Sequence, residues 1–414
     1  MPAPSVRLAL LALSVVAGAA PPVAACTTGV VSGRVTADGR PLLWKNRDAP
    51  DVNNRVVHVA GPGHAYLAVV NAGPGAAVWM GVNAKGFCIE NSVVKDMPRG
   101  GKGMGNGEFM RHALATCATV KEFEELLKET DATGRTTQAN FGVIDAEGGA
   151  AVFETGHVSH VKFDANDPKA APNGYVVRSN FTMTGTGFDK LLDGDDLADV
   201  YSGDRYLRAD ALFLKGARAD ALDSKYLLRQ CSRDLADARG QPLRGSVNGA
   251  PGTLPSAVDT DSTVCRKSTV SVGVFRGVRA GEDPALTTMW VMLGEPTFAV
   301  AVPCWVKAGG VSPLLKGDKL SPLCSLALDA RTDHYTGGKL LKTDGLAERW
   351  GRVWEVEDAL VRDTERQLAR WRKDPPQPDE VMAYHRAAGG FAFDTLAALR
   401  KPREPAPAPR PVMR

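Results

Sequence analysis

The chain has 414 residues, of which 23% are charged, with a formal net charge of +3 and a pI near 8.4. A nucleic-acid-binding protein needs a concentrated basic face, and the charges here are dispersed, so we expect no nucleic-acid partner. The length exceeds the usual size of one hydrophobic core, which predicts a large domain with an appendage, or two domains.

The N-terminus has the pattern of a secretory leader. Arg7 lies in a short polar segment, an apolar run follows over residues 8–20, and small residues precede Cys26. We therefore expect residues 1–25 to be removed on export, which places the mature protein in the periplasm or outside the cell. No later apolar stretch approaches the ~20 residues of a membrane span.

The residues before Cys26 suit two processing enzymes. Val23-Ala24-Ala25 fits general signal peptidase, and the same residues followed by Cys26 also form a lipobox. Plain cleavage leaves a cysteine with a free thiol and a free α-amine, whereas lipidation blocks both groups. The alternative to a catalytic Cys26 is therefore a non-catalytic surface lipoprotein that is lipid-anchored at this residue.

Folded structure is predicted to begin at Cys26 itself. Residues 26–35 and 41–48 are rich in β-forming residues and are separated by Asp38-Gly39, a typical hairpin turn. A lipoprotein normally follows its cysteine with a flexible polar tether, which is missing here. A strand that starts at Cys26 would fix the position of this residue, as catalysis requires.

Strands and helices alternate along the rest of the chain. Helical periodicity is found over residues 108–129 and 201–230, and dense charge accompanies it over residues 350–372 and 379–400. Strand-like runs are predicted at residues 56–59, 66–71, 77–82, 86–94, 139–163, 175–180, 268–275, 287–293 and 297–302. This order predicts an α+β layered fold that ends in a helical hairpin, followed by a disordered Pro-rich and Ala-rich tail over residues 401–414.

The chain has seven cysteines, so at least one stays unpaired in an oxidising compartment. If Cys26 is that one, the other six lack the spacing of a zinc site or of a disulfide-rich scaffold. Cys88 and Cys117 are more typical of small core residues, and Cys231 and Cys265 could pair. We expect neither a metal nor another cofactor.

Several segments, in this order and spacing, resemble the N-terminal-nucleophile hydrolases. The similar branch contains acyl-coenzyme A:6-aminopenicillanic acid acyltransferase, penicillin V acylase and the choloylglycine hydrolases. The segments are residues 26–28, 38–48, 81–87, 177–180, 202–208, 268–271 and 289–296. The resemblance implies a four-layer αββα sandwich over residues 26–310, with a C-terminal helical extension over residues 311–400.

The resemblance also implies roles for single residues. Cys26 is the nucleophile, and its own α-amine takes the thiol proton, so no histidine is required. Asp48 orients this amine, and Arg205 helps to balance the charge of the site. Asn180 matches the asparagine that stabilises the oxyanion, and Asn91 is nearest to the second such position, where choloylglycine hydrolases would place a different residue.

A basic residue accompanies the aspartate in the family. The spacing places it on Lys45, with Arg47 as a competitor, and either cation would favour the thiolate of Cys26. The sequence thus predicts an exported linear amide hydrolase or N-acyltransferase that forms a thioester on Cys26. Its substrate would be a small-molecule or peptide amide of open specificity, and homo-oligomerisation, common among relatives, is also left open.

Overall fold

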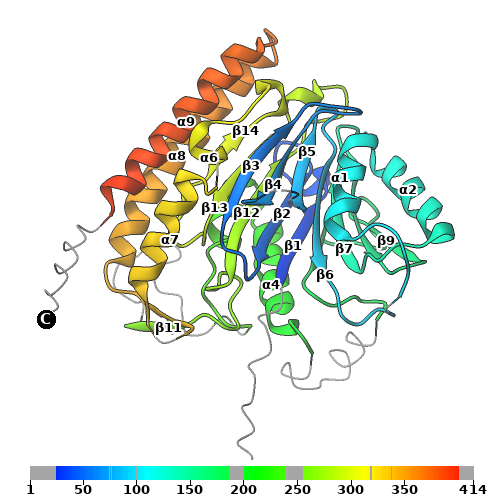
Figure 1. The fold of residues 1–414 in the computed structure, drawn as a ribbon, viewed down its shortest axis with the longest axis horizontal. Coiled ribbons are helices and arrows are strands. Elements are labelled where there is room, and N and C mark those ends of the chain that lie inside the picture. Colours follow the sequence, from blue (N-terminus) through cyan, green and yellow to red (C-terminus); the bar gives the residue numbers. More distant parts are fainter. Residues whose placement is uncertain are drawn as a thin grey trace, which may run out of the picture.

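The computed structural model describes residues 25–73, 75, 77–98, 100–185, 200–238, 240, 255–317, 319–336 and 338–400. Residues 1–24 of the predicted leader and the predicted tail at 401–414 lie outside this part of the chain. Two antiparallel sheets face each other, and helices cover both outer faces (Figure 1). These four layers and the C-terminal helices confirm the predicted α+β sandwich with a helical extension.

The first sheet has six strands in the order β10-β1-β2-β12-β13-β14. They are β1 (Cys26–Val31), β2 (Leu42–Asp48), β10 (Tyr175–Arg178), β12 (Thr269–Arg276), β13 (Thr288–Leu293) and β14 (Val302–Cys304). Strands β1 and β2 form the predicted hairpin and pair in antiparallel register. Gly39 in the connection has φ of 71°, a conformation that favours glycine.

The second sheet has seven strands that follow one another in chain order. They are β3 (Asn54–Val59), β4 (Tyr66–Asn71), β5 (Val78–Asn83), β6 (Cys88–Val93), β7 (Ala139–Ile144), β8 (Ala150–Thr155) and β9 (His160–Asp164). Its outer face is covered by α1 (Asn106–Thr116) and α2 (Val120–Thr133) (Figure 1). Phe109 and Phe123 from these helices pack against Phe141 and Phe153 of the sheet.

The outer face of the first sheet packs against α4 (Gly203–Arg218). A Cβ atom on Gly29 of β1 would lie 2.5 Å from the Phe213 ring of this helix, so the close approach requires glycine. Trp44 of β2 points to the same side, with its ring centroid 5.6 Å from that of Phe213. Alternate residues of β1 and β2 therefore point the other way, into the space between the sheets.

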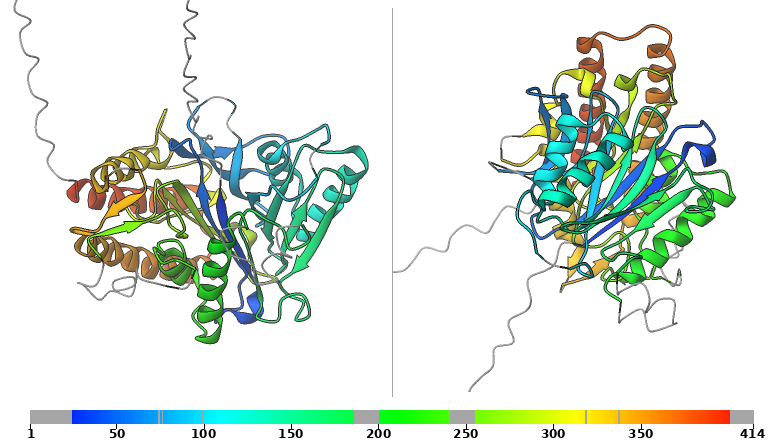
Figure 2. Two further views of the ribbon diagram at one scale, coloured as in Figure 1. Left: turned by 90° about the horizontal axis from the view of Figure 1, so that it is seen from below. Right: turned by 90° about the vertical axis from the view of Figure 1, so that its right-hand side faces the viewer.

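The helical extension contains α6 (Pro313–Lys316), α7 (Pro322–His334), α8 (Leu346–Trp371) and α9 (Pro378–Ala398). Figure 2 shows the last two side by side, as predicted for a helical hairpin. The smaller elements are α5 (Ser224–Tyr226), a π-helical turn at Leu227–Cys231, 3-10 turns at Gly33–Val35, Pro284–Leu286 and Val306–Ala308, and a small sheet of β11 (Ala257–Asp259), β15 (Tyr335–Thr336) and β16 (Leu340–Lys342). No helix in the described residues is long and apolar enough to cross a membrane.

Three expectations differ from the structure. The helix expected over residues 108–129 is two helices, because Cys117 is extended and Thr119 begins α2 with a capping box to Glu122. The strand expected over residues 297–302 is wrong except at its last residue, where β14 begins. All seven cysteines are buried and free, so Cys231 and Cys265 do not pair.

Candidate functional site

Cys26 lies at the start of β1 and is 5% exposed. In the hairpin register Cys26 is opposite Arg47 and Thr28 is opposite Lys45. Side chains that are opposite each other share one face of a sheet, and this face is turned toward the second sheet. The hairpin thus brings the predicted nucleophile and both candidate cations into the space between the sheets.

The backbone nitrogen of Cys26 is held by a side chain. It donates to Asn180 Oδ1 at 2.7 Å, while the preceding Ala25 N donates to the carbonyl of Asp48 at 3.2 Å. Arg205 Nη2 donates to the same Asn180 Oδ1 at 2.8 Å, and Arg205 Nη1 donates to the Cys26 carbonyl at 2.6 Å and to Thr27 Oγ1 at 2.8 Å. Arg205 and Asn180 therefore fix the backbone on both sides of the predicted nucleophile.

Ser202 links Asn180 to the helix that carries Arg205. Its hydroxyl accepts from Asn180 N at 2.9 Å, and its φ of 68° places it in the left-handed region just before α4. Such a conformation is uncommon for a non-glycine residue and is typical of functional sites. Asn180 Nδ2 donates to the carbonyl of Val93 at 2.6 Å, so one of its two amide hydrogens is already engaged.

Lys45 is buried and reaches the second sheet. Its Nζ donates to the carbonyl of Trp79 and to Asn91 Oδ1, both at 2.8 Å. Pairing between β5 and β6 ends at Met80 and Glu90. The ammonium therefore contacts the residue just beyond the last pair on each strand, Trp79 on β5 and Asn91 on β6. Asn91 Nδ2 is buried and has no hydrogen-bond partner among the described residues, which makes it an available donor.

Arg47 is engaged elsewhere. Its Nη1 donates to Asn54 Oδ1 at 2.6 Å and its Nη2 to Asn71 Oδ1 at 2.8 Å, and the guanidinium lies 4.6 Å from the centroid of the Trp79 ring. Burial raises the pKa of the Cys26 thiol, and the charge of Lys45 opposes this increase more strongly than that of Arg47. The geometry favours Lys45 as the cation that acts on the thiol.

Asp48 points to the opposite face of β2, next to β12. Thr269 Oγ1 donates to its Oδ1 at 2.6 Å, and Arg266 Nε lies 3.7 Å from its Oδ2. Burial raises the pKa of this carboxyl, and Arg266 opposes the shift. Oδ2 is buried and accepts no hydrogen bond from the described residues, so it is free to accept one from a nearby amine.

Hydrogen bonds join Cys26, Asn180 and Arg205, and another joins Lys45 to Asn91, while Asp48 lies at the end of β2. The structure also adds residues that the sequence did not predict. Thr27, Ser202 and Thr269 belong to segments that carried the family resemblance, but nothing in those segments assigned them a contact. Glu90, buried beside Thr28, was also missed. An acidic residue directly after the apolar run Phe87-Cys88-Ile89 was the available signal.

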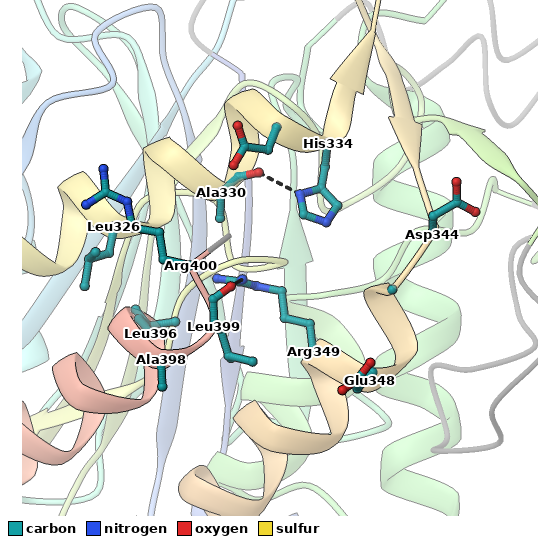
Figure 3. Close-up of a pocket in the computed structure, with 12 residues that line it drawn as sticks. Leu326, Ala330, His334, Asp344, Glu348, Arg349, Leu396, Ala398, Leu399 and Arg400 are labelled. Atoms are coloured by element: carbon teal, nitrogen blue, oxygen red, sulfur yellow. Dashed lines mark hydrogen bonds between the residues drawn. The ribbon is translucent and has the colours of Figure 1, made fainter. Parts of the chain in front are cut away.

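A separate hollow of about 250 Å³ lies among the ends of α7, α8 and α9 (Figure 3). His334, Arg349 and Leu399 are among the residues that line it, and none of the six candidate residues does. Within the described part of the chain, no three His, Cys, Asp or Glu side chains are placed to hold a metal ion.

Comparison with known proteins gives one family match. Residues 35–181 match the family described as acyl-coenzyme A:6-aminopenicillanic acid acyl-transferase. This range includes Lys45, Asp48, Asn91 and Asn180, and it excludes Cys26 and Arg205. Comparison with curated proteins yields no match.

Three similar solved structures are a mutant conjugated bile acid hydrolase from Clostridium perfringens, penicillin V acylase from Agrobacterium tumefaciens and an N-acylethanolamine-hydrolyzing acid amidase ortholog from Caenorhabditis elegans. Their identities to this chain are 14%, 12% and 15%, with TM-scores of 0.43, 0.38 and 0.40. The alignments cover 65%, 68% and 63% of this chain and 89%, 86% and 93% of the respective structures. All three TM-scores are below 0.5. Over residues 35–181 the family match confirms the resemblance to the acyl-coenzyme A:6-aminopenicillanic acid acyltransferase branch.

Proposed function

We propose that this protein is an exported cysteine amidohydrolase or N-acyltransferase that cleaves a linear C–N amide bond through a thioester on Cys26. One observation carries the proposal. The backbone nitrogen of Cys26 lies 2.7 Å from Asn180 Oδ1, in a clamp completed by Arg205. Removal of residues 1–25 would turn this nitrogen into an α-amine that is already positioned, while the buried Oδ2 of Asp48, at the end of the paired strand β2, accepts no hydrogen bond from the described residues.

The chemistry follows from the two groups of an N-terminal cysteine. An α-amine has a pKa of about 8, so about a tenth of it is neutral near pH 7 and can accept the thiol proton. The thiolate then attacks the amide carbonyl, the C–N bond breaks, and the ammonium returns its proton to the leaving amine. Water hydrolyses the thioester, or a second amine accepts the acyl group. Lys45 stabilises the thiolate.

The tetrahedral intermediate needs donors aimed at its oxyanion. Asn91 Nδ2 is a buried donor without a partner, and the Lys45 contact to Asn91 Oδ1 fixes the orientation of this amide. A preorganised donor of this kind contributes roughly 3 to 4 kcal/mol to catalysis in known enzymes. Asn180 would supply the second donor through the amide hydrogen that does not contact Val93.

The burial of Cys26 also bears on the lipoprotein alternative. A diacylglyceryl group must leave the protein surface to enter a membrane, whereas all six residues of β1 are buried in the sheet. Attaching a lipid to the Cys26 sulfur would require this edge of the sandwich to open. The packing therefore supports the catalytic hypothesis over the lipid anchor.

The proposal is tested with two forms of the chain, one beginning at Cys26 and one that retains Ala25. A panel of chromogenic N-acyl amides should be hydrolysed only by the form with a free Cys26 amine, and its Cys26→Ala variant should be inactive. Cys304→Ala, which removes another buried thiol, is the matched control and should stay active. Equal activity in the two forms, or undiminished activity in Cys26→Ala, would contradict the proposal.

A further inference from the structure

Glu90 is a buried carboxyl between the two sheets. It lies on β6, and its Oε1 approaches Gly142 of β7 at a point where Val30 and Leu43 of the first sheet also pack. Thr28 and the Gly142 backbone are its polar neighbours, yet neither carboxyl oxygen makes a hydrogen bond of ordinary geometry with the described residues. A fully buried and poorly satisfied carboxyl is costly, so its presence calls for a physical reason.

Lys45 supplies that reason. The ammonium is buried, and its two hydrogen-bond acceptors, Trp79 O and Asn91 Oδ1, are both neutral. Burial lowers the pKa of Lys45, and the negative charges that oppose this shift are, in order, those of Cys26, Glu90 and Asp48. In a low-dielectric interior a single ammonium strongly favours one nearby anion and gains less from a second.

We propose that Glu90 is a positioning residue that competes with the Cys26 thiolate for the charge of Lys45. When Glu90 is protonated, the ammonium stabilises the thiolate. When Glu90 is ionised, it becomes the partner of the ammonium, and the thiol of Cys26 retains its proton more strongly. The role of the thiolate rests on the proposed function, but the competition itself is a property of the buried charges.

The groups around Glu90 give the direction of the pH dependence. From β2 Glu90 faces Lys45, and Cys26, Arg47 and Asp48 act on the same ammonium. The β1 neighbour of Glu90 is the uncharged Thr28, and Gly142 on β7 carries no charge either. Burial raises the pKa of Glu90 to about 8, although Lys45 opposes the shift. The competition is therefore weak near pH 7 and strong above pH 8, where it would suppress thiolate formation.

The test measures Cys26 ionisation directly and requires no substrate. Thiolate ultraviolet absorbance is followed against pH in the protein that begins at Cys26, and the signal of the Cys26→Ala variant is subtracted. Glu90→Gln should lower the apparent pKa of Cys26 by about one unit, the effect of removing a nearby competing charge. Glu295→Gln is the matched control, because Glu295 is equally buried with a pKa raised to about 8, but its cationic neighbours are Arg331 and Lys267.

A double-variant cycle then separates competition from a general effect of burial. In a Lys45→Met background, Glu90→Gln should cause little further shift, because the shared ammonium is gone. An unchanged Cys26 titration in folded Glu90→Gln, or the same shift with and without Lys45, would overturn the proposal. If Glu90→Gln shifts the Cys26 titration as expected but the protein that begins at Cys26 hydrolyses no amide, the result counts against the proposed function and not against the competition.

Discussion

Two fully buried cations, Arg233 and Lys45, show how differently this fold treats charge. Arg233, just after the π-helical turn, binds Glu357 of α8 with nitrogen–oxygen distances of 2.6 and 2.9 Å, and it also donates to the carbonyls of Pro296 and Ala299 between β13 and β14. Lys45 contacts only neutral oxygens, while Cys26 and Glu90 act on it electrostatically. The fully hydrogen-bonded charge of Arg233 stabilises the packing of the helical extension. The charge of Lys45, which has no ion-pair partner at hydrogen-bond distance, lies at the candidate site and is available to a reacting group.

Substitution of Cys26 at the candidate site should cause the largest loss of activity. Cys26→Ala should lower kcat/KM for a responsive N-acyl amide by about 10³-fold or more, because no other group can form the thioester. The unfolding midpoint in urea should change little, since one sulfur atom is removed. Activity that survives the substitution would show that Cys26 is not the nucleophile.

Breaking the satisfied pair should act on stability instead. Glu357→Gln leaves Arg233 buried without a counter-charge, and such changes typically cost about 3 to 5 kcal/mol in the free energy of unfolding. Urea denaturation measures this loss. The kcat of the molecules that remain folded should match that of the unaltered protein, and a fall in kcat at unchanged stability would show that the extension takes part in the reaction.

Asn91→Ala tests whether Asn91 donates to the oxyanion of the tetrahedral intermediate. Loss of its free Nδ2 donor should lower kcat by about 10²-fold with KM nearly unchanged, because the contact forms mainly in the transition state. Steady-state kinetics give both constants. Val93→Ala, which removes a side chain from the same strand, serves as the control, and an equal loss there would point to general damage to β6.

The stability contributed by the candidate site and by the helical extension should depend on pH in opposite directions. The candidate site should lose stability on the alkaline side. Burial raises the pKa of Glu90 to about 8 from an ordinary value of 4.5, so the folded state binds this proton more tightly. Its contribution to stability is complete below pH 4.5 and is lost as the pH rises through 8. Glu90→Gln should therefore flatten the decrease in Tm over this range, and an unchanged slope would argue against a buried neutral carboxyl.

The smallest expected effect is a loss of stability at acid pH, which comes from the helical extension. His385 on α9 contacts the carbonyl of Pro303 through Nδ1 at 2.9 Å, and burial lowers its pKa to about 4 from 6.5. Its contribution to stability is present above pH 6.5 and is lost as the pH falls through 4. His385→Gln should reduce the acid-side slope of Tm, and a steeper slope would be contrary to this account.

The sequence was most informative where local pattern and geometry coincide. The Asp38-Gly39 turn and β-rich flanks predicted the hairpin, and hairpin register alone places Cys26 and Lys45 on one face. The choice between Lys45 and Arg47 needed the second sheet, because Asn54 and Asn71 that bind Arg47 come from other strands. Glu90 was missed because the role of a charged residue in a buried strand can be assigned only once its neighbours across the sandwich are known.

Mass spectrometry of the protein expressed with residues 1–25 and quenched during turnover shows whether Cys26 is an N-terminal nucleophile. We expect an N-terminus at Cys26 and the substrate's acyl group on the Cys26 sulfur, removable by hydroxylamine as expected of a thioester. A diacylglyceryl group on Cys26, or active protein that still carries Ala25, would contradict it.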